Sequence, residues 1–129
     1  MTPSEFRDFA CDFAVKQRST FIHDADILPL IRQRGVSEVE FNRLKTVLEH
    51  QGIHNHRVLT GIADFEVDDQ LFFRYYLTTL PTAKLANAKR LYQTWLREGV
   101  EVTSSRLAAE LNVPDVEGGM LLGGLRLVC

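Results

Sequence analysis

Residues 36–52, VSEVEFNRLKTVLEHQG, form the stretch that decides the predicted fold. Ser37 and Glu40 have the spacing of a capping box, which marks the start of a helix. Gly52 is typical of the position just after a helix end. Between these signals, apolar residues recur at helical spacing and form one stripe: Phe41, Leu44, Val47 and Leu48. The stretch therefore predicts an amphipathic helix over residues 38–51.

A further helix is predicted directly before this one. Asp24 or Asp26 caps its start, and Pro29 favours Asp26, because proline is best tolerated in the first turn of a helix. Gly35 ends the helix, so a turn of only three residues, 35–37, separates it from the next one. Two helices joined so tightly make a helix-turn-helix candidate.

The flanking segments add one helix and several strands. Thr2, Pro3 and Glu5 predict the capped start of an N-terminal helix, and residues 19–23 predict a short strand. Three phenylalanines on one face of the N-terminal helix predict that it packs onto a core rather than onto an aromatic ligand: Phe6, Phe9 and Phe13.

A β-hairpin is predicted downstream. Residues 57–63 and 70–78 are rich in β-branched and aromatic residues, and Asp68-Asp69 between them has the composition of a turn. The alternative is a single strand followed by a short helix near Leu71–Leu77.

The order helix, short strand, helix, turn, helix, hairpin over residues 3–80 resembles the winged-helix superfamily. The resemblance is one of pattern, and it implies an α+β, mostly helical fold whose domain 1–80 contains three helices plus a β-hairpin. It also implies a non-enzymatic DNA-binding regulator or accessory domain that reads the major groove of double-stranded DNA with its third helix. The candidate DNA contacts are polar residues of that helix and of the hairpin: Asn42, Arg43, Lys45, Thr46, His50 and Arg57.

Residues 81–129 predict a helical C-terminal region of three helices, packed on the first domain or on a second copy of the chain. Within it, residues 103–127 carry a partial helix-turn-helix pattern. The last helix, 116–127, is strongly apolar, so we expect it to bind a second copy or a larger protein. Its candidate interaction residues are Met120, Leu121, Leu122 and Leu125.

Charge supports an alternative function. The chain has a net charge of −2, and residues 19–80 contain six Lys and Arg against nine Asp and Glu, a net of −3. Acidic side chains near a phosphate backbone oppose the contacts on which DNA binding depends. The alternative is a winged-helix-like protein-interaction or assembly module that binds no DNA and dimerises through the apolar C-terminal helix.

No enzyme, cofactor or metal is predicted. Phosphate-binding loops and nucleophile motifs are missing from the sequence, and paired carboxylates have the positions of helix caps and turns. His50, His54 and His56 support a metal site only as a third hypothesis. Gly52 interrupts their helical spacing, and we expect no nearby cysteine or carboxylate to complete the ligand set.

The compartment is predicted from apolar stretches and cysteines. No apolar stretch approaches the ~20 residues that a membrane span requires, and no signal peptide is recognised at the start. Two cysteines, Cys11 and Cys129, do not form a disulfide framework. We therefore expect a cytoplasmic protein that does not contact membranes.

Overall fold

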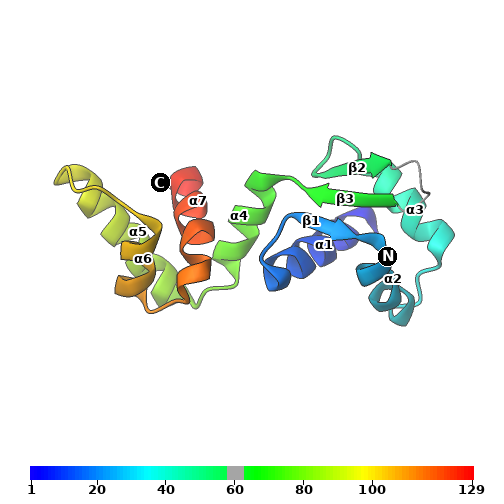
Figure 1. Ribbon diagram of the computed structural model, residues 1–129, viewed down its shortest axis with the longest axis horizontal. Helices are drawn as coiled ribbons and strands as arrows, with labels where there is room; N and C mark the ends of the chain where they lie inside the picture. The colour runs from blue at the N-terminus through cyan, green and yellow to red at the C-terminus, as the bar shows by residue number, and fades with distance from the viewer. Residues whose placement is uncertain (58–62) are drawn as a thin grey trace. The chain divides into compact units, whose positions relative to one another are not determined.

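The computed structural model describes residues 1–57 and 63–129, which form two compact units, Met1–Phe72 and Phe73–Cys129. The predicted α+β, mostly helical fold is confirmed in these residues (Figure 1). In chain order the elements are α1 (Pro3–Gln17), β1 (Phe21–His23), α2 (Asp24–Gln33), α3 (Glu38–Val47), β2 (Ile53–Arg57), β3 (Ala63–Val67), α4 (Asp69–Thr78), α5 (Thr82–Arg97), α6 (Ser104–Leu111), the 3-10 turn η1 (Asp115–Glu117) and α7 (Gly118–Val128).

The predicted capping box at the start of α1 is confirmed. The Glu5 backbone N–H donates to Thr2 Oγ1 at 3.1 Å, and the Thr2 N–H donates to the Glu5 carboxylate at 3.3 Å. Of the predicted phenylalanine stripe, only Phe6 is fully buried, whereas Phe9 and Phe13 are half-buried. These two line a shallow groove between α1 and α2.

Strands β1, β3 and β2 form one antiparallel sheet in that order, beside helices α1, α2 and α3 (Figure 1). Phe65 of the central strand pairs with Ile22 on one side and Asn55 on the other. Its ring lies 6.2 Å from the rings of both Phe6 and Phe41, measured between centroids. The core of this unit is therefore an aromatic cluster to which α1, α3 and β3 each contribute one ring.

The preference for Asp26 as the cap of the second helix is wrong. Helix α2 begins at Asp24, and Pro29 lies inside it. Proline removes one backbone hydrogen bond to the residue four positions earlier, here Ala25. Both residues are exposed, so water can hydrate the carbonyl that lacks its donor.

The third helix is shorter than the predicted 38–51. The Ser37 side chain accepts from the Glu40 N–H at 3.2 Å, as the capping box requires, but α3 already ends at Val47. His50 and Gly52 both have positive φ angles, 65° and 107°, which are incompatible with a continuing right-handed helix. The chain turns there and enters β2.

The predicted strand over residues 70–78 is wrong, and the alternative helix is confirmed. The Asp68 carboxylate accepts from the N–H groups of Gln70 and Leu71, so it caps α4 rather than marking a hairpin turn. The hairpin pairs β2 with β3 instead. Of the other predicted strand, residues 57–63, positions 58–62 lie outside the described residues.

The second unit contains the C-terminal half of α4 together with α5, α6, η1 and α7. The division between the two units falls within α4, between Phe72 and Phe73, whereas the sequence predicts a boundary at residue 80. Glycines of α7 explain why the rest of α4 belongs here: a Cβ at Gly123 would lie 2.9 Å from the Phe73 ring, and one at Gly124 would lie 2.7 Å from Leu77. Thr103 caps the start of α6, since its hydroxyl accepts from the Arg106 N–H at 3.1 Å.

Candidate functional site

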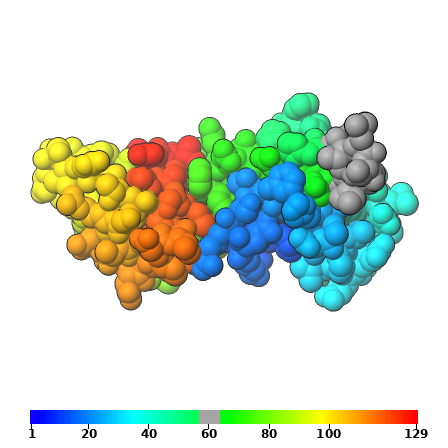
Figure 2. Space-filling view, in the orientation of Figure 1, coloured from blue at the N-terminus to red at the C-terminus, as the bar shows by residue number. Residues whose placement is uncertain are grey.

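The outward face of α3 is the candidate functional site, because the sequence places most of its proposed contacts there. Figure 2 shows this helix, in cyan, reaching the surface of the molecule. Its inward residues Phe41, Leu44 and Leu48 are buried. The helix is thereby fixed against the aromatic core, and its opposite side faces solvent.

Asn42 and Thr46 lie on the exposed face, as predicted. The Thr46 hydroxyl donates to the Asn42 backbone carbonyl at 2.9 Å, so it is already satisfied within the helix. His50 is exposed but lies after the helix, at its left-handed turn position. Arg57 ends β2, and its side chain is outside the described residues.

Arg43 is exposed but paired. Its Nε and a terminal nitrogen donate to the two oxygens of Glu40, at 2.8 and 2.5 Å. The hydrogen bond from Arg43 holds the pKa of the Glu40 carboxyl below its ordinary value, and the carboxylate raises the pKa of the guanidinium. A phosphate group would have to compete with this two-bond partner for the same guanidinium.

The predicted role of Lys45 in DNA contact is wrong, because its side chain is only 4% exposed. Its ammonium nitrogen lies 2.5 Å from Oδ2 of Asp24 and 4.5 Å from the centre of the Phe41 ring. Position 45 follows Phe41 by four residues and precedes Leu48 by three, so it belongs to the apolar stripe of the helix. That spacing is the sequence signal that would have placed Lys45 inward.

Two valines lie on this face, where only polar contacts are predicted. Val39 is 81% exposed and Val47 is 41% exposed. The predicted place of Val47 in the inward apolar stripe is therefore wrong. Together with the polar residues of the same face, the valines form what we call the α3 stripe: Val39, Asn42, Arg43, Thr46 and Val47.

The predicted interaction residues of the last helix are mostly core residues. Met120, Leu121 and Leu125 of α7 are at most 6% exposed, and Leu122 is half-buried. These three side chains are therefore covered within the second unit and are not free to contact a partner. Small glycines on α7 let α4 approach closely, and the leucines fill the interior of the second unit instead.

Cys11 carries no nucleophilic chemistry in this arrangement. It is buried in α1, and burial raises the pKa of its thiol to about 11. At neutral pH it is therefore protonated, whereas the thiolate is the reactive form.

Comparisons of the chain with models of protein families, with curated proteins and with solved structures found no match. Within residues 1–57 and 63–129, no helix combines the length and the apolar character needed to cross a lipid bilayer.

Proposed function

We propose that the chain is a non-enzymatic protein-interaction module whose winged-helix-like N-terminal unit binds a protein partner through the α3 stripe. The observation that carries the proposal is that the exposed face of α3 is partly apolar, while both cations of this helix are already bound to carboxylates. Val39 and Val47 lie two turns apart and offer apolar contact area. Desolvating them in an interface is favourable by roughly 25 cal/mol per Å² of apolar surface.

Charge supports a protein partner over DNA. The unit Met1–Phe72 contains eight Lys and Arg against twelve Asp and Glu, a net charge of −4. On α3 itself, Arg43 is held by Glu40 and Lys45 is buried against Asp24. Nonspecific affinity for DNA comes from several free cations that displace counterions from phosphates, and α3 supplies none.

DNA binding is the second candidate, and the arrangement of elements favours it. The order α1, β1, α2, α3, β2, β3, with β3 central in the sheet, fits the winged-helix pattern to which the sequence is similar. In such an arrangement the third helix is the one that enters the major groove. Fold alone does not determine function. The acidic charge of the unit and the engaged cations of α3 therefore place a protein partner ahead of DNA.

A photo-crosslinking amino acid at position 39 tests the proposal in cells that express the full chain. We expect a discrete protein adduct from this position and none from the same probe at Ser4, an exposed residue of α1. An excess of wild-type chain should suppress the adduct, and an excess of Val39→Asp should not. Val39 is almost fully exposed, so this substitution leaves the fold intact. An adduct with nucleic acid, or equal competition by Val39→Asp, would overturn the proposal.

Titration with duplex DNA at low and moderate salt tests the second candidate directly. If the chain is a protein-interaction module, we expect it to bind the duplex weakly or not at all, without the steep loss of binding at higher salt that phosphate contacts produce. Steep salt dependence that is lost in Arg43→Ala would replace the protein partner with DNA as the ligand of this face.

A further inference from the structure

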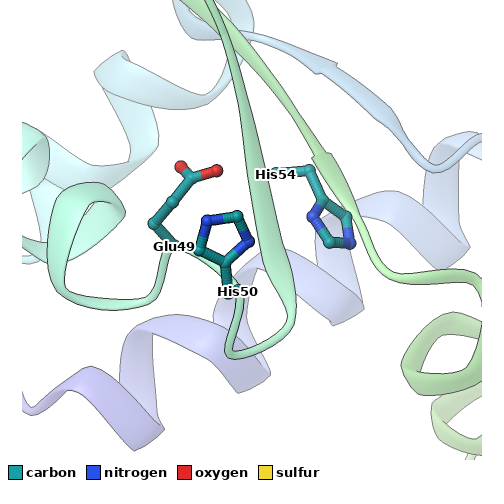
Figure 3. A group of neighbouring side chains, drawn as sticks. All are labelled: Glu49, His50 and His54. Carbon is teal, nitrogen blue, oxygen red and sulfur yellow. The ribbon is translucent and has the colours of Figure 1, made fainter.

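A group of metal-binding side chain types gathers at the turn between α3 and β2. Glu49, His50 and His54 each offer one ligand atom, and these three atoms all lie within 4.8 Å of one another. In Figure 3 the His50 ring lies between the Glu49 carboxylate and the His54 ring. Both imidazoles are exposed and Glu49 is half-buried, so an ion could reach the group from solvent.

The backbone of the turn brings the three residues together. The His50 N–H donates to the Ile53 carbonyl at 3.3 Å, and the Gln51 N–H donates to the Leu48 carbonyl at 2.7 Å. Gly52 has a φ of 107°, a conformation that side chains strongly disfavour. The tight reversal returns the chain so that His54 lies next to His50, although no helix connects them.

Neighbouring polar groups orient two of the three ligands. Glu49 Oε2 accepts from the Asn55 backbone N–H at 3.2 Å and also from the Asn55 side-chain amide. Nε2 of His54 lies 3.6 Å from Oδ1 of Asp68. A carboxylate beside one ring nitrogen of a histidine is a common support for metal binding by the other nitrogen. Here it leaves Nδ1 of His54 and Oε1 of Glu49 for the ion.

We propose that Glu49, His50 and His54 form a binding site for Zn²⁺ that joins the end of α3 to β2. Two imidazoles and one carboxylate suit zinc, whereas Mg²⁺ and Ca²⁺ prefer oxygen ligands alone. Ligand atoms at zinc distances of about 2.0–2.2 Å lie roughly 3.3 Å apart in a tetrahedron. Small rotations of exposed side chains bring the group to that spacing, and water or a partner residue completes the coordination. The site is independent of the proposed protein-binding function of the α3 stripe.

From the sequence, a metal site at these histidines ranks only as a third hypothesis, for two reasons. Gly52 interrupts the helical spacing of His50 and His54, whereas in the structure the turn at Gly52 joins them. Glu49, the carboxylate directly before His50, is not recognised as a ligand at that point. A carboxylate and two histidines within six residues, divided by a glycine, is the signal that points to the site.

Titration of the metal-free full chain with Co²⁺, followed by absorption spectroscopy and by displacement with Zn²⁺, tests the proposal. We expect one equivalent to bind and to raise the thermal unfolding midpoint. Glu49→Gln, His50→Asn and His54→Thr should each weaken binding by at least about tenfold. Asparagine tolerates the left-handed backbone of position 50, and glutamine keeps an acceptor for Asn55, so both variants preserve the turn.

His23→Ala and His56→Ala are the matched controls. Both histidines are exposed residues of the same sheet and lie beside Asp64 and Glu66, respectively, outside the metal-binding group. We expect both variants to bind Co²⁺ like the wild type. Absence of saturable binding of one equivalent, or binding that survives both His50→Asn and His54→Thr, would overturn the proposal. Circular dichroism of each metal-free variant separates loss of the site from loss of the fold.

Discussion

The buried ammonium group of Lys45 and the half-buried carboxylate of Asp24 form an ion pair, with 2.5 Å between Nζ and Oδ2. The pair joins the last turn of α3 to the first residue of α2. The lysine also lies over the rings of Phe41 and Phe65, at 4.5 and 5.7 Å from their centres. The ammonium group contacts one carboxylate and two aromatic rings in place of water. Removal of either charge would therefore leave the other without its ionic partner.

Removing only the lysine should destabilise the N-terminal unit. Lys45→Ala leaves the half-buried Asp24 without its cation, and we expect the free energy of unfolding to fall by about 2–3 kcal/mol. The double variant Asp24→Leu/Lys45→Met replaces both charges with apolar groups and should recover most of this loss. Urea denaturation followed by circular dichroism measures both. Equal stability of Lys45→Ala and wild type would contradict the importance of the pair.

Asp24 should give the stability a distinct dependence on pH. Burial raises the pKa of its carboxyl above the ordinary value of 3.8, although the hydrogen bond from Lys45 opposes the shift. A raised pKa in the folded state means that the folded chain holds this proton more tightly than the unfolded chain. The contribution to stability is therefore present below the ordinary pKa and is lost as pH rises through the raised one.

We accordingly expect the stability of Asp24→Asn, measured relative to the wild type at the same pH, to increase as pH rises through the raised pKa of Asp24. Denaturant unfolding at several pH values measures the difference, and Asp26→Asn, an exposed position of the same helix, gives the background slope. A difference that moves in the opposite direction would show that pairing with Lys45, rather than burial, dominates the titration of Asp24.

Two glycines of α7 should respond to alanine with opposite signs. A Cβ at Gly123 would press on the Phe73 ring, so Gly123→Ala should lower the free energy of unfolding by about 1–3 kcal/mol. A Cβ at Gly119 meets no atom within 4 Å, so Gly119→Ala should raise it by about 0.5–1 kcal/mol. Thermal unfolding compares the two variants. Equal effects would mean that α7 does not pack on α4 as described.

Leu121 should matter for folding and not for association. Its side chain is fully buried, so Leu121→Ala should cost about 2–4 kcal/mol of stability. Sedimentation of the folded variant should give the same mass as the wild type at every concentration. A concentration-dependent mass that only the wild type shows would restore the last helix as an association surface.

The two cysteines should react at very different rates. Cys129 is exposed, whereas burial raises the pKa of Cys11 to about 11 and shields it from reagents. At pH 8 only about one thiol in a thousand is ionised when the pKa is 11. An aromatic disulfide reagent should therefore modify one thiol quickly in the native chain and both in denaturant. Rapid modification of both in the native chain would show that α1 opens readily.

Much of the first unit follows from local sequence signals. Thr2 with Glu5 and Ser37 with Glu40 predict where α1 and α3 begin, because capping residues act within one turn of helix. The predicted strand at residues 70–78 fails for a reason of the same kind. The preference of aromatic residues for strands depends on context, and the short-range cap at Asp68 decides the outcome in favour of α4.

The candidate sites were harder to predict, because they depend on contacts between distant segments. The spacing of Lys45 from Phe41 and Leu48 places it inward, but its ionic partner Asp24 lies 21 positions earlier in the chain and no local pattern identifies it. Whether Leu121 is free for a partner depends on the helices of the second unit that pack against α7, chiefly α6. Periodicity identifies an apolar face, but only the packed structure shows whether that face is already covered.

The turn between α3 and β2 also supplies a means of finding distant relatives. Position 52 disfavours side chains, because its φ of 107° strains any residue other than glycine and a Cβ there would also displace the end of the Leu71 side chain. Position 50 requires a residue that accepts positive φ. A chain that shares this reversal will therefore keep glycine at the equivalent of 52, with histidine, asparagine, aspartate or glycine two places before. That two-position signature can persist after overall similarity has faded.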